Sequence, residues 1–280
     1  MQTLQIPALD GYSLAATRYD APEASDKIML ICSANGVLQR FYRDFATFWT
    51  TLGYTVYTFD YRGIGDSRPA SLRNFQATIQ TWGEQDASGI LQYIFDQHPT
   101  ASVDILAHSI GGQILGLIKG VERVRRLAIV ASSGGYVGHW SGWGKAKLFF
   151  NWYVGIPMLS RAFGYLPAKR LRMFEDLPKG VALEWAKWGR HSEYMMGYLT
   201  EEQARPYRTL SAPLLLYTFS DDTFCPLPAV QWLARQYQAA QLTHKHYQPR
   251  DFQLSSIGHF NFFRKKYQPY FWDEVAAFFQ

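Results

Sequence analysis

Short apolar runs alternate with longer segments of helical character along most of this 280-residue chain. Four continuous apolar runs are of the length and composition typical of strands that are buried on both faces. They lie at 27–32, 54–59, 103–107 and 126–131. Apolar residues spaced three and four apart predict helices at 40–52 and 75–97, between these strands. This alternation, with short connections, favours an α/β fold with a mostly parallel sheet covered by helices on both faces.

The same patterns extend this reading toward both ends of the chain. Two strands at 4–8 and 13–19, joined at Asp10-Gly11, predict a hairpin. The remaining elements are expected at 110–119 (helix), 213–217 (strand), 229–239 (helix), 242–247 (strand) and 265–279 (helix). The alternation stops at Gly134-Gly135, and the next 75 or so residues are aromatic and basic with no clear strand. We therefore expect a core domain formed by 1–133 and 211–280, with a helical insertion at 134–210.

Composition narrows the class of protein. With 48% hydrophobic and 18% charged residues, the chain is expected to be globular, with one large domain. Cys32 and Cys225 are far apart and in no metal-ligand spacing, which argues against a disulfide framework and favours a reducing compartment. The first residues lack the pattern of a secretory signal, and no stretch is long and apolar enough to span a membrane. These features predict a cytoplasmic protein.

The net charge of +5 is concentrated in one part of the chain. Residues 139–190 contain nine Lys and Arg against three Asp and Glu. No nucleic-acid-binding module accompanies this charge, so a nucleic-acid partner is not expected. Three interpretations remain open: a solvated helical surface, attraction of an anionic substrate, or contact with a membrane surface.

The stretch 105–112 places Ser109 where a buried strand gives way to a helix. A sharp turn there leaves no room for bulk two residues before and after the serine, and Ala107 and Gly111 meet that demand. Gly112 allows the helix to lie close to the sheet. The hydroxyl would then be exposed at a helix N-terminus, where free N–H groups can hold negative charge. The alternative is an ordinary turn, because the pattern also arises by chance.

A nucleophilic serine needs a base within reach and an acid that orients the base. Asp221 and Asp222 directly follow one predicted strand, and His259 follows the last strand by a short loop. The carboxyl ends of parallel strands share one edge of the sheet, and Ser109 lies at the same edge. We therefore expect these groups to meet.

The order serine, aspartate, histidine in these contexts resembles the α/β-hydrolase family. The resemblance covers nearly all of the chain outside 134–210, and it includes Asn35-Gly36 and the segment 60–67, each after a strand. It implies an α/β-hydrolase fold in which 134–210 forms a helical cap or lid. Two positions differ from the usual pattern: Ala107 replaces the first glycine of the serine motif, and Asn35 replaces a histidine.

The resemblance also implies roles for individual residues. Ser109 would be the nucleophile and His259 the general base and acid. Asp222 would be the orienting acid, since the family's acid commonly lies four residues before a proline, here Pro226; Asp221 stays an alternative. The backbone N–H groups of Ile110 and Val37 would form the oxyanion hole.

These roles predict a serine hydrolase that cleaves an ester, thioester or amide through an acyl-enzyme on Ser109, without a metal or cofactor. The expected partner is a small-molecule acyl substrate, with a medium-chain or amphiphilic acyl ester preferred. Two alternatives are an acyltransferase that uses the same three residues and a catalytically silent ligand-binding protein of the same fold.

Other residues have competing interpretations. His108 adjoins the serine, but a residue one step along a turn points elsewhere, so we do not expect it to be the base. His244 and His246 lack further ligands at metal spacing, which argues against a zinc site. The aromatic residues of the insertion either pack its helices or form an acyl pocket over Ser109. They include Tyr136, Trp140, Trp143, Phe149, Phe150, Trp152, Tyr153, Phe163 and Tyr165.

Overall fold

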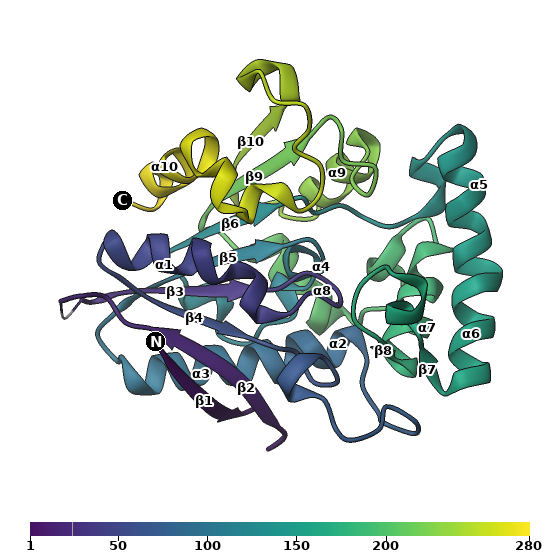
Figure 1. Ribbon diagram of the computed structural model, residues 1–280, viewed down its shortest axis with the longest axis horizontal. Coiled ribbons are helices and arrows are strands. Elements are labelled where there is room, and N and C mark those ends of the chain that lie inside the picture. The colour runs from purple at the N-terminus through teal and green to yellow at the C-terminus, as the bar shows by residue number, and fades with distance from the viewer. Residues whose placement is uncertain (24) are drawn as a thin grey trace.

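Eight strands form one sheet, in the order β1-β2-β4-β3-β5-β6-β9-β10, in the computed structural model, which describes residues 1–23 and 25–280. The strands are β1 (Gln2–Pro7), β2 (Ser13–Tyr19), β3 (Lys27–Cys32), β4 (Tyr54–Phe59), β5 (Ser102–His108), β6 (Arg126–Val130), β9 (Pro213–Phe219) and β10 (Gln241–Tyr247). β1 and β2 form the predicted antiparallel hairpin, and the strands from β4 to β10 pair in parallel. The predicted α/β fold with a mostly parallel sheet is confirmed (Figure 1).

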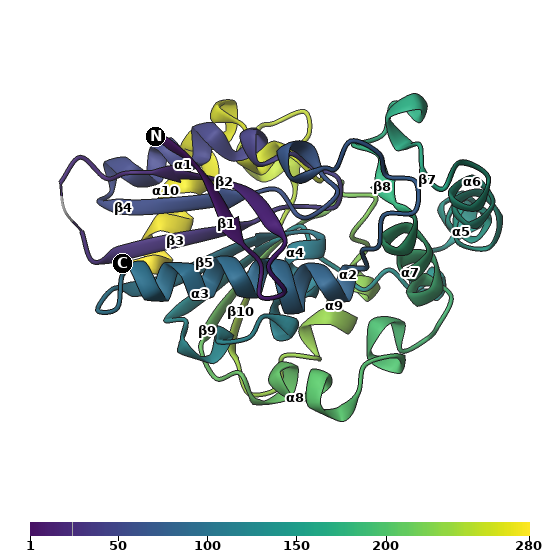
Figure 2. The same cartoon turned by 90° about the horizontal axis from the view of Figure 1, so that it is seen from below.

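The sheet is covered on both faces because successive strand residues point to opposite sides. Along β3, Ile28 and Leu30 join one hydrophobic cluster, whereas Met29 and Ile31 join the other. The first cluster is completed by α3 (Ser88–Gln97) and α9 (Leu227–Ala234), the second by α1 (Arg43–Thr51) and α10 (Gln268–Phe279). Figure 2 shows these two helix layers on either side of the strands.

Several helices differ in length from their predictions. The helix expected at 75–97 begins at Ile79, because the Thr78 hydroxyl accepts the Thr81 N–H at 3.0 Å and caps it. It runs through α2 (Ile79–Thr81) and a π-helical turn (Trp82–Ala87) into α3. The helix expected at 229–239 ends at Ala234, and the 265–267 part of the last helix is a separate 3₁₀ turn.

The helix after Ser109 is much shorter than predicted. α4 (Ile110–Gln113) gives way to a 3₁₀ turn at Leu115–Leu117, whereas the pattern predicted a helix to residue 119. Glycine is a poor helix former, and Gly116 lies where the Tyr207 ring packs against the backbone. A Cβ at Gly116 would lie 2.5 Å from that ring. Close packing of the Tyr207 ring thus requires glycine, a poor helix former, just beyond the end of α4.

The segment between β6 and β9 is mainly helical, as expected. Its elements are α5 (Gly142–Phe150), a π-helical turn (Asn151–Gly155), α6 (Ile156–Phe163), α7 (Lys179–Gly189) and α8 (Glu201–Thr209). Two strands of two residues, β7 (Tyr165–Leu166) and β8 (Leu177–Pro178), pair antiparallel and were not predicted. Of these helices, α8 packs into the main core through Tyr207, whose hydroxyl donates to the Gln113 carbonyl at 2.7 Å.

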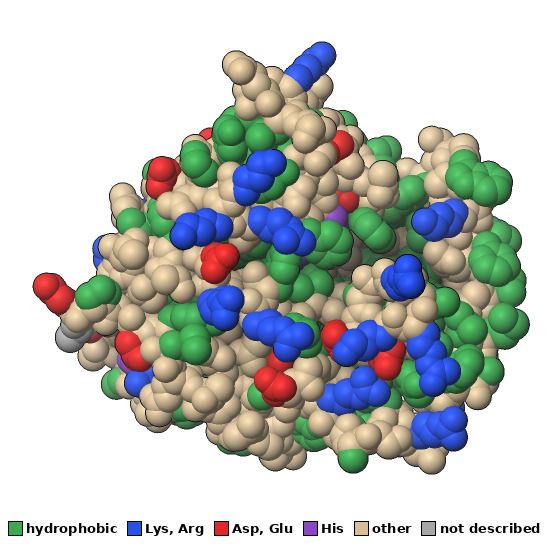
Figure 3. Space-filling view, viewed as in Figure 1, with side chains coloured by type: hydrophobic (Ala, Val, Ile, Leu, Met, Phe, Trp, Pro, Cys, Tyr) green, Lys and Arg blue, Asp and Glu red, His purple; other side chains and the backbone are tan. Residues whose placement is uncertain are grey.

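The aromatic residues of this segment divide into two groups. Trp140 and Trp152 line a cavity at Ser109, which is described below. Trp143, Phe149 and Phe150 are exposed instead, so packing and pocket formation do not account for them. Figure 3 shows hydrophobic side chains gathered along the outer edge of the molecule, where α5 and α6 lie. No helix in the described ranges has the length and apolar character needed to cross a membrane.

Candidate active site

Ser109 occupies the turn between β5 and α4 in a strained backbone conformation. Its φ is +53° and its ψ is −116°, a region that side chains other than glycine rarely adopt. Neighbouring strands hold the turn in place. The Ser109 N–H donates to the Val130 carbonyl at 3.0 Å, and the Ser109 carbonyl accepts the Ser132 hydroxyl at 2.7 Å. The conformation turns the Ser109 side chain off the line of the strand.

The residues after the serine are small because the backbone approaches other elements closely. A Cβ at Gly111 would lie 2.6 Å from the Cys32 carbonyl oxygen at the end of β3. A Cβ at Gly112 would overlap the Ile129 side chain on β6. The contacts agree with the tight turn inferred from the sequence.

Ser109, His259 and Asp222 form a continuous hydrogen-bonded series. The Ser109 hydroxyl lies 2.9 Å from Nε2 of His259, and Nδ1 of His259 lies 2.7 Å from Oδ2 of Asp222. The Asp222 carboxylate is buried, and its other oxygen accepts the Phe224 N–H at 2.8 Å. A carboxylate only accepts, so Nδ1 of His259 carries the proton and Nε2 is free to accept the serine proton.

Asp221 has a different environment from Asp222. Its two carboxylate oxygens accept the N–H groups of Ile257 and Gly258, at 2.8 and 3.0 Å. These two residues immediately precede His259. Asp221 thus secures the loop that carries the imidazole, while Asp222 contacts the imidazole itself.

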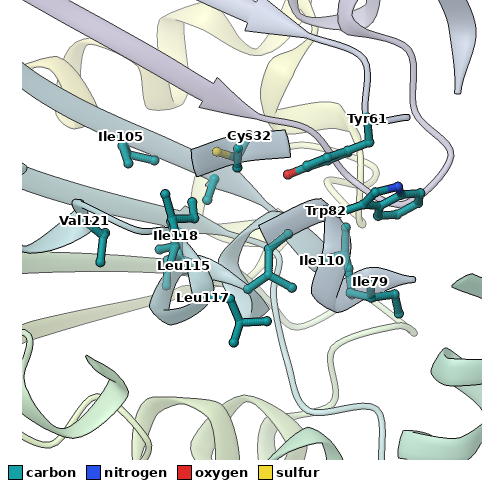
Figure 4. Packing of buried hydrophobic residues seen from close by; sticks show 14 of the residues in the cluster. Cys32, Tyr61, Ile79, Trp82, Ile105, Ile110, Leu115, Leu117, Ile118 and Val121 are labelled. Carbon is teal, nitrogen blue, oxygen red and sulfur yellow. The ribbon is translucent and has the colours of Figure 1, made fainter. Parts of the chain in front are cut away.

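The two residues expected to form an oxyanion hole differ in how their N–H groups are engaged. The Ile110 N–H is the first of α4 and has no hydrogen-bond partner among the described residues. Its side chain anchors it in the core, as Figure 4 shows together with Cys32 and Trp82. The Val37 N–H donates to the Ala34 carbonyl at 3.1 Å and closes a turn. Val37 therefore has a competing acceptor that Ile110 lacks.

His108 is fully buried on the side of β5 that faces α1, and it does not contact the Ser109 hydroxyl. Its Nε2 donates to the His259 carbonyl at 2.9 Å, so its Nδ1 must accept from the Tyr42 hydroxyl at 2.8 Å. The Tyr42 oxygen in turn accepts the Ala34 N–H at 2.9 Å. Burial, and to a smaller extent the nearby His259 ring, holds the pKa of His108 well below its ordinary value. His108 is thus a neutral structural link.

Loops beside the site are braced by Asp60, at the end of β4. Its carboxylate accepts the N–H groups of Gln39 at 2.8 Å and Asp66 at 3.1 Å. This agrees with the interpretation of 60–67 as a supporting turn. Asn35, in the loop before Gln39, has a buried side-chain amide whose nitrogen and oxygen find no partner among the described residues.

A cavity of about 90 Å³ opens beside Ser109 and His259. Its other walls come mostly from the segment between β6 and β9 and are mainly apolar. They are Gln113, Ser133, Gly135, Trp140, Leu148, Asn151, Trp152, Ile156, Met173, Phe174, Trp185, Phe224 and Cys225. A wider groove of about 570 Å³, with Arg40 and Arg264 on its walls, shares Met173 and Phe174 with this cavity. The serine thus faces an aromatic cavity that adjoins a more polar groove.

The site also contains the one set of potential metal ligands found among the described residues. Ligand atoms of Asp222, Cys225 and His259 lie within 4.8 Å of one another. The carboxylate and imidazole already bond to each other, and burial raises the pKa of the Cys225 thiol well above its ordinary value. These features favour the hydrogen-bonded arrangement over metal binding.

His244 and His246, the two histidines on β10, both form hydrogen bonds with the Thr218 hydroxyl, at 2.7 and 2.9 Å.

Sequence reasoning missed several residues that the structure places at the site. Cys225 lies three residues after Asp222 on the same turn, with its sulfur 3.9 Å from Nδ1 of His259. That spacing was a usable signal. Trp185 on α7 and Phe174 carry no such signal, because only the fold of the inserted segment brings them to the cavity.

Residues 33–263 match the model of a family described as the alpha/beta hydrolase family. No curated protein matches the chain. Solved structures with a similar fold include an esterase from Pyrococcus furiosus, at 14% identity and a TM-score of 0.63, covering 99% of this chain and 89% of that one. An esterase from Exiguobacterium antarcticum has 16% identity, a TM-score of 0.62 and 99% coverage of both chains. MenH from S. aureus has 16% identity and a TM-score of 0.57, covering 94% of this chain and 97% of that one.

Proposed function

The chain belongs to the alpha/beta hydrolase family, and we propose that it is a serine hydrolase that cleaves acyl esters through an acyl-enzyme on Ser109. The single observation that carries this proposal is the hydrogen-bonded series from Ser109 through His259 to buried Asp222. In this series the serine hydroxyl has a base beside it, and the base has a carboxylate that orients it. Residues 134–210, whose side chains line much of the cavity, would act as the cap.

The proposed reaction begins when the Ser109 oxygen attacks the acyl carbon while Nε2 of His259 takes the hydroxyl proton. Asp222 stabilises the imidazolium that forms. The imidazolium then protonates the leaving alcohol, and an ester between Ser109 and the acyl group remains. Water, deprotonated by the same nitrogen, then attacks the acyl carbon. The bond from that carbon to the Ser109 oxygen breaks, His259 returns the proton to Ser109, and the acid is released.

Negative charge develops on the substrate oxygen during both attacks. The Ile110 N–H is the stronger candidate to stabilise it, because it has no competing acceptor among the described residues. Val37 would contribute by sharing its N–H with the Ala34 carbonyl or by releasing that bond. One donor of this kind is worth about 3 kcal/mol of transition-state stabilisation.

The shape of the site supports an amphiphilic acyl ester as substrate. The cavity of about 90 Å³ is well below the roughly 300–1,000 Å³ of pockets that enclose drug-sized ligands. A short or medium acyl chain would enter this apolar cavity, and the alcohol portion would lie in the adjoining groove of about 570 Å³.

The proposal is tested with a fluorophosphonate probe, which reacts with activated serines. We expect one modified serine, Ser109, by peptide mass spectrometry, together with hydrolysis of nitrophenyl esters. The matched control is Ser102→Ala, at the opposite end of β5, which should react as the wild type does. Ser109→Ala should lose both labelling and turnover.

Two results would reject the proposal: an unmodified Ser109 in folded protein, or equal ester turnover by Ser109→Ala. Adding acceptor alcohols during turnover separates hydrolysis from acyl transfer. A hydrolase releases the free acid, whereas an acyltransferase converts most of the acyl group into a new ester.

A further inference from the structure

One long helical rod lies at the edge of the molecule and is only partly covered by protein. α5 continues through the π-helical turn at Asn151–Gly155 into α6, so the rod runs from 142 to 163 (Figure 1). α5 contains no buried residue. A helix in water usually buries an apolar stripe against its neighbours, and helical stability comes mainly from that contact. The exposure of α5 therefore requires an explanation.

The rod has two apolar faces with different surroundings. Leu148, Trp152 and Ile156 point inward and line the cavity at Ser109. Trp143, Phe150, Val154 and Met158 follow one another at spacings of seven and four residues, which places them on one face of a helix. They are 85%, 55%, 43% and 57% exposed. We call these four residues the outer face.

The charge along the rod has one sign. Residues 142–163 include Lys145, Lys147 and Arg161 and no Asp or Glu. All three cations are exposed, and none forms an ion pair within the described part of the chain. Figure 3 shows Lys and Arg side chains beside the hydrophobic ones in this region.

Lys147 lies three residues before Phe150 and Arg161 three residues after Met158, which places both cations beside the outer face. Lys145 lies three residues before Leu148, on the opposite side of the rod. An exposed stripe of aromatic and aliphatic residues accompanied by cations is typical of helices that lie in a lipid interface.

We propose that the outer face docks on an anionic lipid surface, with Trp143 and Phe150 inserted among the lipids and the cations at the headgroups. A second copy of this chain would be a poorer partner, because pairing two outer faces brings like charges together without a carboxylate to offset them. Anionic headgroups supply the opposite charge, and the acyl region accepts the apolar side chains. Charge complementarity thus selects the occupant.

Docking in this way would also indicate where the substrate comes from, an inference that rests on the proposed hydrolase function. The outer face and the cavity wall belong to the same rod, so a docked rod has lipid on one side and the Ser109 cavity on the other. The substrates would then be acyl esters dissolved in the lipid surface.

The test measures sedimentation of the full chain with vesicles, using Ser109→Ala so that no lipid is consumed. One set of vesicles contains phosphatidylcholine alone, and the other contains phosphatidylcholine and phosphatidylglycerol. We expect partition into the anionic vesicles to be at least tenfold stronger, and to weaken as salt is added. A blue shift of tryptophan emission should accompany binding.

Two combined variants separate the apolar and charged contributions. Trp143→Ser with Phe150→Ser and Met158→Ser should reduce partition into both vesicles by at least tenfold. Lys147→Gln with Arg161→Gln should reduce partition into anionic vesicles about 10- to 100-fold.

The matched controls remove comparable groups from other surfaces. They are Leu9→Ser with Leu227→Ser, and Lys119→Gln with Arg205→Gln and Arg235→Gln. Both should bind as the parent does, and all of the changed residues are exposed, so the variants should fold.

Absent binding, or binding unaffected by the outer-face variants, would overturn the proposal. The proposal would also be overturned if the protein formed a dimer that the apolar variant dissociates but that anionic vesicles leave intact. These outcomes are independent of the hydrolase assignment: vesicle binding uses an inactive protein, whereas probe labelling of Ser109 uses no lipid.

Discussion

The backbone carbonyl of His259 accepts a hydrogen bond from Nε2 of His108, 2.9 Å away. His108, which adjoins the proposed nucleophile Ser109, thus fixes the backbone of His259, the proposed base. The link continues from His108 through Tyr42 to Ala34, in the loop of the proposed second oxyanion donor. Parts of the site far apart in the chain therefore share one buried network.

Replacing His108 should separate its effect on the position of His259 from its effect on the packing of the core. In His108→Leu the His259 carbonyl and the Tyr42 hydroxyl lose their partner, so the protein should lose about 2 kcal/mol of stability and about tenfold or more in kcat. His108→Gln retains an N–H near the position of Nε2 and should recover most of the kcat. Denaturant titration and ester kinetics measure the two effects. Equal kcat in both variants would show that the link to His259 does not position the base.

The same residue predicts a component of the pH dependence of stability. The native state keeps buried His108 neutral, while in the unfolded chain it takes up a proton near its ordinary pKa of 6.5. Stability from this group is therefore complete above that pH and decreases as the pH falls below it, by about 1.4 kcal/mol per pH unit. The free energy of unfolding of His108→Gln should lack this component. Parallel curves for the two proteins between pH 6.5 and 5 would contradict the prediction.

Asp222 and Asp221 should differ sharply in their effect on catalysis. Asp222→Asn replaces the partner of Nδ1 of His259 and should lower kcat by about 10⁴-fold, as the wrong imidazole tautomer is favoured. Asp221→Asn weakens two bonds to the loop backbone and should cost far less activity, with a measurable loss of stability. The two variants serve as controls for each other in steady-state kinetics. A larger loss in Asp221→Asn would reverse the assignment.

The backbone strain at Ser109 should be measurable as a stability difference. Glycine adopts a φ of +53° without the cost that a side chain incurs, so Ser109→Gly should be about 1 kcal/mol more stable than Ser109→Ala. At Ser102, in regular strand β5, the order should reverse, because glycine weakens a strand. Chemical denaturation of the four variants tests both comparisons. If the glycine and alanine variants had the same order of stability at both positions, backbone strain at Ser109 would not explain the difference.

Trp185 should control the length of acyl chain that the cavity accepts. Its ring lies on the cavity wall, with its centre 4.8 Å from that of Trp152. Trp185→Ala enlarges the apolar space, so kcat/KM for octanoyl relative to acetyl nitrophenyl esters should rise about tenfold. Leu9→Ala, an exposed residue outside the cavity, should leave the ratio unchanged. An unaltered ratio in Trp185→Ala would place the acyl chain elsewhere.

Much of the fold was predictable because strand patterns are local and parallel strands align their carboxyl ends. That rule predicted that Ser109, His259 and the pair Asp221-Asp222 would approach one another, and the hydrogen bonds of Ser109, His259 and Asp222 agree with it. The preference for Asp222 over Asp221 came from the family resemblance. The alignment of strand ends does not predict which acceptor each backbone N–H group of a loop will bond. The engagement of Val37 by Ala34 therefore appears only in the folded chain.

Contacts between distant elements explain the other differences. The helix after Ser109 stops early, and beyond its end the ring of Tyr207, far along the chain, packs against Gly116 where no side chain would fit. The exposed outer face was not foreseen for a related reason. Apolar spacing in the rod indicates an amphipathic helix, but the neighbour that covers each face depends on the whole fold.

The connection from β6 to β9 contributes both to the pairing of the sheet strands and to the cavity wall at Ser109. These strands are paired neighbours, and of the helices that connect them α8 packs into the main core through Tyr207. The residues from 134 to the start of α8 supply most of the cavity wall at Ser109 but neither His259 nor Asp222. Substitutions in this stretch can therefore reshape the space beside Ser109 without removing any partner of the hydrogen bonds that join Ser109, His259 and Asp222.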